Sequence, residues 1–289
     1  MLLEAPSLPN ANIQADWAEA SCLLGNDTSV SRAEFEIALT EFGYDNSELV
    51  IGNIWAEIGW RKSVIPKYYP IDIHYNRIER NRSWQNILSY SFMLLLSTSS
   101  FYESTKLRQR EQGTLSKLFE RLATAALKRY LTRSINIGSP REGRMPRSLF
   151  QSLELFCDFS NEVMRERPEI THYAKDEGVD VIAWNPIDVR SGQVVLLIQC
   201  TIEKNWPRST NKINLDTWKN IVNFAATPSK ALAFPYVCRS QWKNWSTRGG
   251  ILFDRLRLAS FFPMTSRIYL RKKTSEWCER QISRLRWFD

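Results

Sequence analysis

Residues 175–184 read Lys-Asp-Glu-Gly-Val-Asp-Val-Ile-Ala-Trp, and residues 193–201 read Gln-Val-Val-Leu-Leu-Ile-Gln-Cys-Thr. Both contain apolar runs typical of buried strands, and each run has one polar side chain, Asp180 in the first and Gln199 in the second. A carboxylate buried among apolar residues is costly unless a partner compensates its charge. A divalent metal ion is a partner that gives such an arrangement a chemical use.

The segment between the two runs contains the turn-forming pair Ser-Gly at 191–192, so we expect the runs to form a hairpin. A tight turn places Asp180 opposite Glu203, whereas a wider loop places it opposite Ile198. In both registers Asp180 lies on the strand next to the segment 199–203, about 5 Å away. Oxygen atoms of the two strands are then close enough to share one ion.

These two segments resemble the PD-(D/E)XK nucleases, the restriction-endonuclease-like superfamily, and especially its Mrr-type variants with Gln in the second position. The resemblance implies an α/β fold with an αβββαβ core. It also implies that Asp180, Gln199 and the Cys200 backbone carbonyl bind Mg²⁺ or Mn²⁺. Glu120, in the helical segment 113–122, matches the Glu that the superfamily keeps on the helix before the first strand, and is implied as a further ligand.

The superfamily usually has a catalytic Lys two residues after the second metal ligand, but Thr201 stands there in this chain. A threonine cannot supply the cation that orients the attacking water or stabilises charge on the phosphate. Lys204, at the strand end, and Lys212, in the following segment, are the two candidates for a relocated lysine. Without such a lysine the site would be catalytically degenerate.

The chain has a net charge of +8, which favours a polyanionic partner such as DNA. A basic insertion at 132–148 has the composition of a loop. We expect it to contact the phosphate backbone through Arg133, Arg141, Arg144 and Arg147.

The region from Arg239 onward is also rich in arginine, interleaved with tryptophan. Trp206, Trp218, Trp242 and Trp245 are suited either to core packing or to stacking on bases. Their spacing does not decide between the two.

Five cysteines are scattered without a CxxC pair and only two histidines are present, so we expect no zinc site and a reducing, cytoplasmic setting. The first residues lack the basic and apolar regions of a signal peptide. The most apolar run, 92–97, is far shorter than the roughly 20 residues that cross a bilayer. We therefore predict a soluble protein without a membrane partner.

Residues 1–108 are predicted to form a predominantly helical region without a catalytic pattern, which docks a partner or DNA. Residues 109–289 are predicted to form the nuclease-like domain, with the basic insertion 132–148 and C-terminal helices. Its expected elements are helices 112–131 and 148–166, strands 179–184 and 194–201, helix 214–226, strands 231–237 and 267–271, and helix 275–287. One strand of the αβββαβ core has no place in this pattern.

The resemblance implies a Mg²⁺-dependent DNA endonuclease that hydrolyses phosphodiester bonds. By the same resemblance, we expect a role in bacterial restriction or antiphage defence beside a partner ATPase or helicase. Two alternatives remain open at this point. One is a catalytically degenerate nuclease-fold subunit that binds DNA or scaffolds a complex, and the other is a toxin that cleaves RNA.

Overall fold

The computed structural model describes residues 2–141, 143, 145–166, 176–261 and 268–288. The chain divides into two compact units, which are treated separately below. The first unit comprises Met1–Gln112, Pro235–Val237 and Arg255–Asp289, and the second comprises Gly113–Phe234 and Cys238–Asp254.

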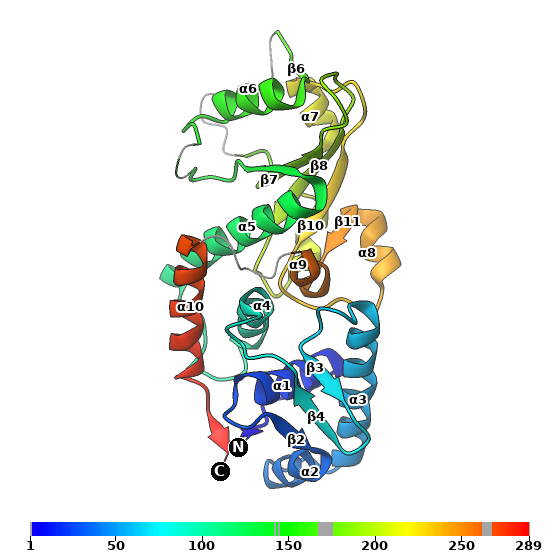
Figure 1. Cartoon of the computed structure of the whole chain (residues 1–289), viewed down its shortest axis with the longest axis vertical. Helices are drawn as coiled ribbons and strands as arrows, with labels where there is room; N and C mark the ends of the chain where they lie inside the picture. Colours follow the sequence, from blue (N-terminus) through cyan, green and yellow to red (C-terminus); the bar gives the residue numbers. More distant parts are fainter. Residues whose placement is uncertain (1, 142, 144, 167–175, 262–267, 289) are drawn as a thin grey trace. The chain divides into compact units, whose positions relative to one another are not determined.

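The first unit contains mostly helices together with a small antiparallel sheet (Figure 1). The sheet has the strand order β2-β4-β3, a feature absent from the predicted helical pattern of residues 1–108. Its helices are α1 (Ala11–Leu24), α2 (Arg32–Glu41), α3 (Ser47–Val64), α4 (Leu88–Thr98), α9 (Arg255–Phe261) and α10 (Ile268–Ile282). Its strands are β1 (Leu2–Leu3), β2 (Ser29–Ser31), β3 (Ile71–Ile73), β4 (Arg77–Arg80) and β12 (Trp287–Phe288).

The start of α2 shows how the sequence sets a helix boundary. Ser31 accepts a hydrogen bond from the Glu34 N–H at 3.2 Å, and the Glu34 carboxylate accepts one from the Ser31 N–H at 2.7 Å. This reciprocal capping box satisfies backbone donors that the first helical turn leaves unpaired. This motif sets the first residue of α2.

The division between the units differs from the predicted domains at the C-terminal end. The predicted boundary after residue 108 lies near the division after Gln112, but Arg255–Asp289 folds with the first unit instead of with 109–289. This segment completes the core of the first unit because its apolar side chains pack there. The ring of Trp277 lies edge-on to Phe92, with centroids 5.1 Å apart, and β12 pairs with β1.

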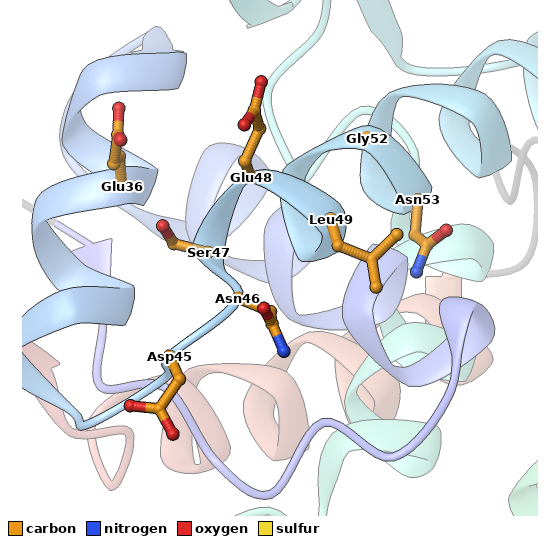
Figure 2. Close-up of a pocket in the computed structure, with 8 residues that line it drawn as sticks. All are labelled: Glu36, Asp45, Asn46, Ser47, Glu48, Leu49, Gly52 and Asn53. Carbon is orange, nitrogen blue, oxygen red and sulfur yellow. The ribbon is translucent and has the colours of Figure 1, made fainter.

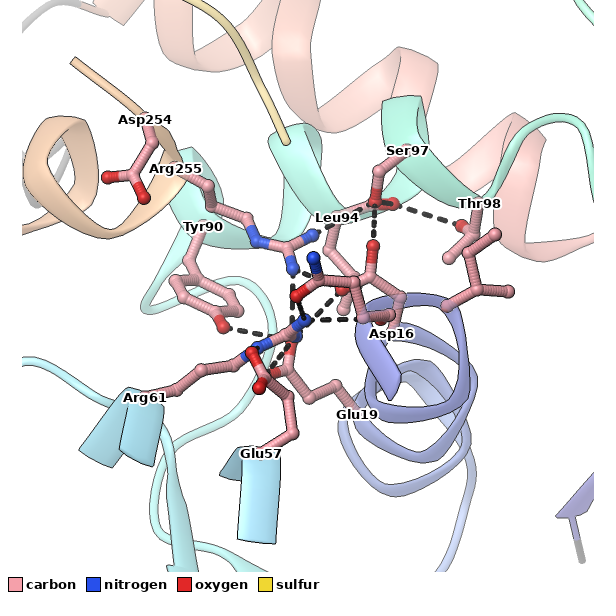
Figure 3. A network of polar contacts seen from close by, with 12 residues as sticks. Asp16, Glu19, Glu57, Arg61, Tyr90, Leu94, Ser97, Thr98, Asp254 and Arg255 are labelled. Atoms are coloured by element: carbon pink, nitrogen blue, oxygen red, sulfur yellow. Dashed lines mark hydrogen bonds and ion pairs between the residues drawn. The ribbon is translucent and has the colours of Figure 1, made fainter. Parts of the chain in front are cut away.

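Two fully buried arginines join α1, α3 and the start of α9 inside the first unit (Figure 3). Arg61 Nη1 lies 2.7 Å from Asp16 Oδ1 and 2.8 Å from Glu19 Oε1, and Arg255 pairs with the same Asp16 carboxylate. Tyr90 donates a hydrogen bond of 2.8 Å to Glu19. Desolvation by itself raises the pKa of Asp16, but the two guanidinium groups hold it below its ordinary value. This buried ion cluster fixes the beginning of α9.

The strand predicted at 267–271 is wrong for the residues that the structure describes, because Ile268 begins α10. Leu270, Thr274, Trp277 and Cys278 recur at spacings of three and four residues and are all buried. Such spacing places side chains on one face of a helix. Because burial of this face in the first unit stabilises the helix, the segment around Tyr269 is helical despite its short strand-like pattern.

The second unit is built on a five-stranded sheet of order β11-β10-β8-β7-β5 (Figure 1). Strands β5, β7 and β8 are antiparallel neighbours, whereas β8, β10 and β11 are parallel. Its larger elements are α5 (Gln109–Leu131), β5 (Arg133–Asn136), α6 (Leu149–Ser160), β7 (Val181–Asn185), β8 (Val194–Cys200), η1 (Trp206–Asn211), α7 (Leu215–Ile221), β10 (Ser229–Ala233), α8 (Trp242–Gly249) and β11 (Ile251–Phe253). A small ribbon pairs β6 (Val163–Met164) with β9 (Val222–Asn223).

Strand β5 corrects the prediction for the basic insertion, whose first residues were expected to be a loop. Ile135 pairs with Ile182 and Asn136 with Val181, which makes β5 an edge strand. Four residues with exposed or half-buried side chains give too weak an alternation to predict a strand, but an edge strand needs only one hydrogen-bonded neighbour. The first residues of the basic insertion therefore form an edge strand that the sequence did not predict.

The hairpin of β7 and β8 has a register that neither prediction gave. Val181 pairs with Ile198 and Trp184 pairs with Val195, which is one residue away from the register of the wider loop. Asp180 precedes the paired residues, and its N–H donates to the Ile198 carbonyl. The loop between the strands is longer than a two-residue turn, and its composition does not fix where pairing starts. In the observed register, the side chains of Asp180 and Gln199, the polar residues of two otherwise apolar runs, contact each other.

The main core of the second unit lies between the hairpin and two helices. Buried side chains of α6 and α7 pack on the face of β7 and β8 that bears Ile182, Trp184, Val195 and Leu197. Phe156 of α6 meets Trp184 edge-on, with ring centroids 5.3 Å apart. This apolar layer packs against the hairpin. Asp180 and Gln199, at the polar end of the hairpin, are not part of the layer.

Candidate metal centre

Asp180 lies directly before β7, with its backbone hydrogen-bonded on both sides. Its N–H donates to the Ile198 carbonyl at 2.9 Å, and its own carbonyl accepts from the N–H groups of Ile137 and Gly138 at 2.8 and 3.0 Å. These bonds extend the pairing of β7 with β8 and with β5 by one residue. The Asp180 backbone is therefore bonded to two neighbouring chain segments, and only 7% of the residue is exposed.

The Gln199 side chain bridges the two oxygen atoms that the sequence assigns to a metal ion. Its Nε2 donates to Asp180 Oδ2 and to the Cys200 carbonyl, both at 2.8 Å. The Cys200 N–H also donates to Asp180 Oδ2, at 2.7 Å. Rotation of the amide by about 180° exchanges its nitrogen for its oxygen, which would direct three oxygen atoms at one point. Burial raises the pKa of the Cys200 thiol, so that group stays neutral.

The Glu120 side chain, on α5, also lies next to Gly138 and close to the Asp180 carboxylate. A Cβ atom on Gly138 would lie 2.7 Å from Glu120 Oε2 and 2.9 Å from Asp180 Oδ1. Because both oxygens lie within 3 Å of one point, they are less than about 6 Å apart. The absence of a side chain at residue 138 therefore allows the two carboxylates to approach each other.

Strand β5 positions α5 against the hairpin through two side chains. Ser134 Oγ donates to the Thr124 carbonyl at 2.7 Å, and Asn136 Nδ2 donates to Glu120 Oε2 at 3.3 Å. Two residues along a strand and four along a helix both advance about 6 Å, so the two bonds match in spacing. The side chains of Ser134 and Asn136 thus place Glu120 next to the end of β5.

Lys117 is the basic residue of this site, and the sequence analysis missed it. Its Nζ lies 2.7 Å from Glu120 Oε2 and would lie 3.1 Å from a Cβ atom on Gly138. Its side chain is only 15% exposed. Lys117 precedes Glu120 by three residues, a spacing that places both on one face of α5. That spacing is the signal in the sequence that could have predicted the pair, whereas the family pattern points to the strand after Gln199.

The two carboxyl groups disfavour each other's ionisation. Burial raises the pKa of Asp180 to about 8, and the nearby Glu120 carboxylate adds to the shift. Burial also raises the pKa of Glu120, although Lys117 opposes that effect. A cation bound between them would remove the repulsion and favour the ionised form of both groups.

The two lysines proposed from the sequence lie on the surface. Lys204 and Lys212 are exposed, and among the described residues neither forms a hydrogen bond or ion pair with Asp180 or Glu120. The carbonyl of Lys212 approaches the backbone of Gly178, which turns the Lys212 main chain toward the loop before β7. Lys117, and neither of these two lysines, forms an ion pair with Glu120 among the described residues.

Among the described arginines of the basic insertion, Arg133 and Arg147 are exposed and Arg141 is partly buried. Arg133 is exposed on β5, whereas the Arg141 side chain donates to the Arg147 carbonyl at 3.0 Å. Arg141 is partly buried, and desolvation lowers its pKa. Arg144 lies outside the described residues. Arg141 therefore contributes to the fold of the insertion, which weakens its assignment as a simple phosphate contact.

Within the described residues, no group of three or more His, Cys, Asp and Glu side chains has an arrangement suited to a metal ion. The candidate ligands around Asp180 are two carboxylates, one amide and one carbonyl. A hollow of about 600 Å³ in the first unit is lined by Glu36, Asp45 and Glu48 (Figure 2). These acidic side chains are exposed, so water screens them and they need no bound cation.

No protein-family model matches this chain, and neither the curated proteins nor the solved structures include a significant match. Among the described helices, none has the combination of length and apolar character required to cross a bilayer. The geometry around Asp180 is therefore the basis on which a function is inferred.

Proposed function

We propose that this chain is a metal-dependent nuclease that hydrolyses phosphodiester bonds in DNA. The observation that carries the proposal is the buried Asp180 carboxylate, which meets Gln199 and Cys200 across the hairpin and has Glu120 beside it. The order α5, β5, β7, β8, α7, β10, with α6 inserted after β5, supports a restriction-endonuclease-like αβββαβ core.

The residues present are chemically suited to Mg²⁺ or Mn²⁺. Both ions prefer oxygen ligands, and the Asp180 and Glu120 carboxylates, the Cys200 carbonyl and the rotated Gln199 amide would offer only oxygen. When bound, the ion lowers the pKa of a coordinated water and neutralises charge on the scissile phosphate. Because Gln199 is uncharged, we expect weaker metal binding than at a site where Glu occupies that position.

Lys117 supplies the cation that Thr201 cannot provide. Its ammonium group lies beside Glu120 at the margin of the site, on the helix and not on the strand end. From there it orients the attacking water and stabilises negative charge on a non-bridging phosphate oxygen. The water oxygen forms a new bond to phosphorus and gives its proton to solvent. The bond to the departing sugar oxygen breaks, and that oxygen takes a proton from water.

The test is cleavage of supercoiled plasmid by the purified protein in Mg²⁺ or Mn²⁺. Asp180→Ala should abolish nicking, and Lys117→Met should reduce the rate by about two orders of magnitude, as for loss of one preorganised charge. Lys128→Met, on the exposed end of α5, is the matched control and should cleave at the wild-type rate. Full activity of Asp180→Ala would overturn the proposed site.

A second candidate is a nuclease-fold subunit that has lost catalysis and binds DNA or scaffolds a complex. The observation that favours it is that both carboxylates already have polar partners from the protein. Lys117 pairs with Glu120, while Gln199 and the Cys200 N–H pair with Asp180. If DNA binds but neither Mg²⁺ nor Mn²⁺ binds or supports cleavage, this candidate replaces the nuclease.

The same assay with RNA in place of plasmid tests the alternative of an RNA-cleaving toxin. By resemblance, we infer that the nuclease acts in the bacterial cytoplasm with a partner ATPase or helicase, in restriction or antiphage defence. Cleavage that appears only when such a partner is added would support that role. Preferential cleavage of RNA over DNA would exclude this role in restriction or antiphage defence.

A further inference from the structure

Two stretches of the second unit carry an excess of positive charge. Residues 201–212 and 238–250 contain one acidic residue, Glu203. Their basic residues are Lys204, Arg208, Lys212, Arg239, Lys243 and Arg248. The first stretch contains η1 and the second contains α8, which pack against each other. The excess therefore belongs to one region of the folded unit, here called the η1–α8 surface.

Three cations of the η1–α8 surface lack acidic partners. Arg208, Lys243 and Arg248 are exposed, and among the described residues none of them forms an ion pair with a carboxylate. Elsewhere in the unit, lysines do find such partners, as Lys219 does with Asp216 at 3.6 Å. Unpaired surface cations leave a positive potential that attracts polyanions.

Aromatic rings support this surface from below. Trp206 stacks flat on Phe234, with centroids 4.0 Å apart and planes 4° from parallel, and Trp245 meets Trp206 edge-on at 5.7 Å. The Arg248 guanidinium lies over the Trp245 ring, 5.5 Å from its centroid. Trp245 is half-buried, so part of its indole remains accessible next to an arginine. An indole beside an arginine is an arrangement on which bases stack.

The aromatic series begins next to the candidate metal centre. Cys200 pairs with Ala233 on the neighbouring strand, and Phe234 is the next residue of that strand. From there the contacts pass through Trp206 to Trp245. One strand spacing, one residue along the chain, the reach of the Phe234 side chain and the two ring contacts give a path of roughly 20 Å. This is roughly half a turn of a DNA duplex.

We propose that the η1–α8 surface binds the nucleic-acid strand on its way to the metal centre. Arg208, Lys243 and Arg248 contact successive phosphates, and the accessible part of Trp245 stacks on an unpaired base. This role rests on the proposed nuclease function and extends it by naming where the substrate lies. It also assigns to this surface the phosphate contacts that we predicted for the basic insertion.

The test is binding of a fluorescent single-stranded oligonucleotide, measured by anisotropy in EDTA so that metal and cleavage play no part. The variant has Arg208→Glu, Lys243→Glu and Arg248→Glu together. Each lost phosphate contact removes about one unit from the slope of log affinity against log salt. We expect the slope to fall by about two to three units and the affinity to fall by about tenfold or more.

A double variant, Lys128→Glu with Arg129→Glu, is the matched control, since both residues are exposed on α5 of the same unit. It should bind with nearly the wild-type slope. Trp245→Leu should weaken binding of single strands more than of duplex, without a change of slope. Thermal unfolding of each variant verifies that the unit remains folded.

An unchanged slope for the triple variant would overturn the proposal, as would an equal loss in the control. Wild-type binding of an acidic peptide in preference to the oligonucleotide would show that this is a protein-docking surface and would likewise overturn it. The nuclease proposal fails separately, by absence of plasmid cleavage in a protein whose η1–α8 surface still binds nucleic acid.

Discussion

Replacement of Asp180 by Asn should stabilise the metal-free protein, and the gain should increase with pH. Burial raises the pKa of Asp180 to about 8 from the ordinary 3.8, with a further contribution from Glu120. The unfolded chain therefore releases this proton at a much lower pH than the folded chain does. Between the two pKa values, ionisation of Asp180 favours the unfolded state.

The sign and size of the effect follow from these pKa values. Below about pH 4 both states hold the proton, so Asp180 does not change stability there. From about pH 4 to about pH 8, each pH unit subtracts about 1.4 kcal/mol from the free energy of unfolding. The total at neutral pH is about 4 kcal/mol. Asn keeps an acceptor oxygen for the Cys200 N–H and has no charge to desolvate.

The measurement is urea unfolding in EDTA at about pH 5 and about pH 7, for the wild type and Asp180→Asn. The variant should gain about 2 to 3 kcal/mol more at the higher pH than at the lower. Asp188→Asn is the control, because Asp188 is solvent-exposed and hydrogen bonds from Arg190 lower its pKa. Both of its pKa values lie below pH 5, so its removal should cost a small amount of stability that is the same at the two pH values.

An equal difference between wild type and Asp180→Asn at both pH values would refute this reasoning, because it would show that Asp180 ionises as an exposed carboxyl does. A saturating concentration of Mn²⁺ provides a second check. Bound cation favours the ionised form, so Mn²⁺ should stabilise the wild type and leave Asp180→Asn unaffected. Stabilisation of both proteins would place the ion elsewhere.

Three further substitutions test other parts of the structure. Gly138→Ala should weaken Mn²⁺ binding in calorimetric titration, because its Cβ would lie within 3 Å of both the Glu120 and the Asp180 carboxylate. Gln199→Glu adds one negative ligand and should tighten Mn²⁺ binding by about tenfold, measured by the same titration. Asp16→Asn removes a carboxylate shared by two buried arginines and should cost about 3–5 kcal/mol in urea unfolding.

The sequence was sufficient to predict the hairpin and the meeting of its two polar side chains. An Asp and a Gln interrupt runs that are otherwise apolar, and an apolar run can be recognised without knowledge of its neighbours. The helix around Glu120 was predicted for a similar reason, since its apolar residues recur at helical spacing. These features depend on local patterns, which a single sequence displays directly.

The register and the first strand of the sheet could not be predicted, because they depend on partners distant in the sequence. The loop of the hairpin permits several registers, and packing of Trp184 against α6 selects one of them. Strand β5 has no apolar alternation of its own. It forms because Ser134 and Asn136 bond to α5 while its backbone pairs with β7.

Lys117 illustrates how tertiary structure determines which residue supplies a charge. Lys204 is nearer to Gln199 in sequence, but the chain after β8 turns outward and leaves it exposed. Lys117 is far from both polar strand residues in sequence, yet α5 is held beside β5, and the chain just after β5 passes through Gly138, next to Asp180. A helix can therefore bring a lysine to a site formed by strand ends, where Gly138 leaves room for its side chain. The cleavage rates of Lys117→Met and Lys204→Met decide between these positions. A loss confined to Lys117→Met supports the helix, and a loss confined to Lys204→Met restores the strand end.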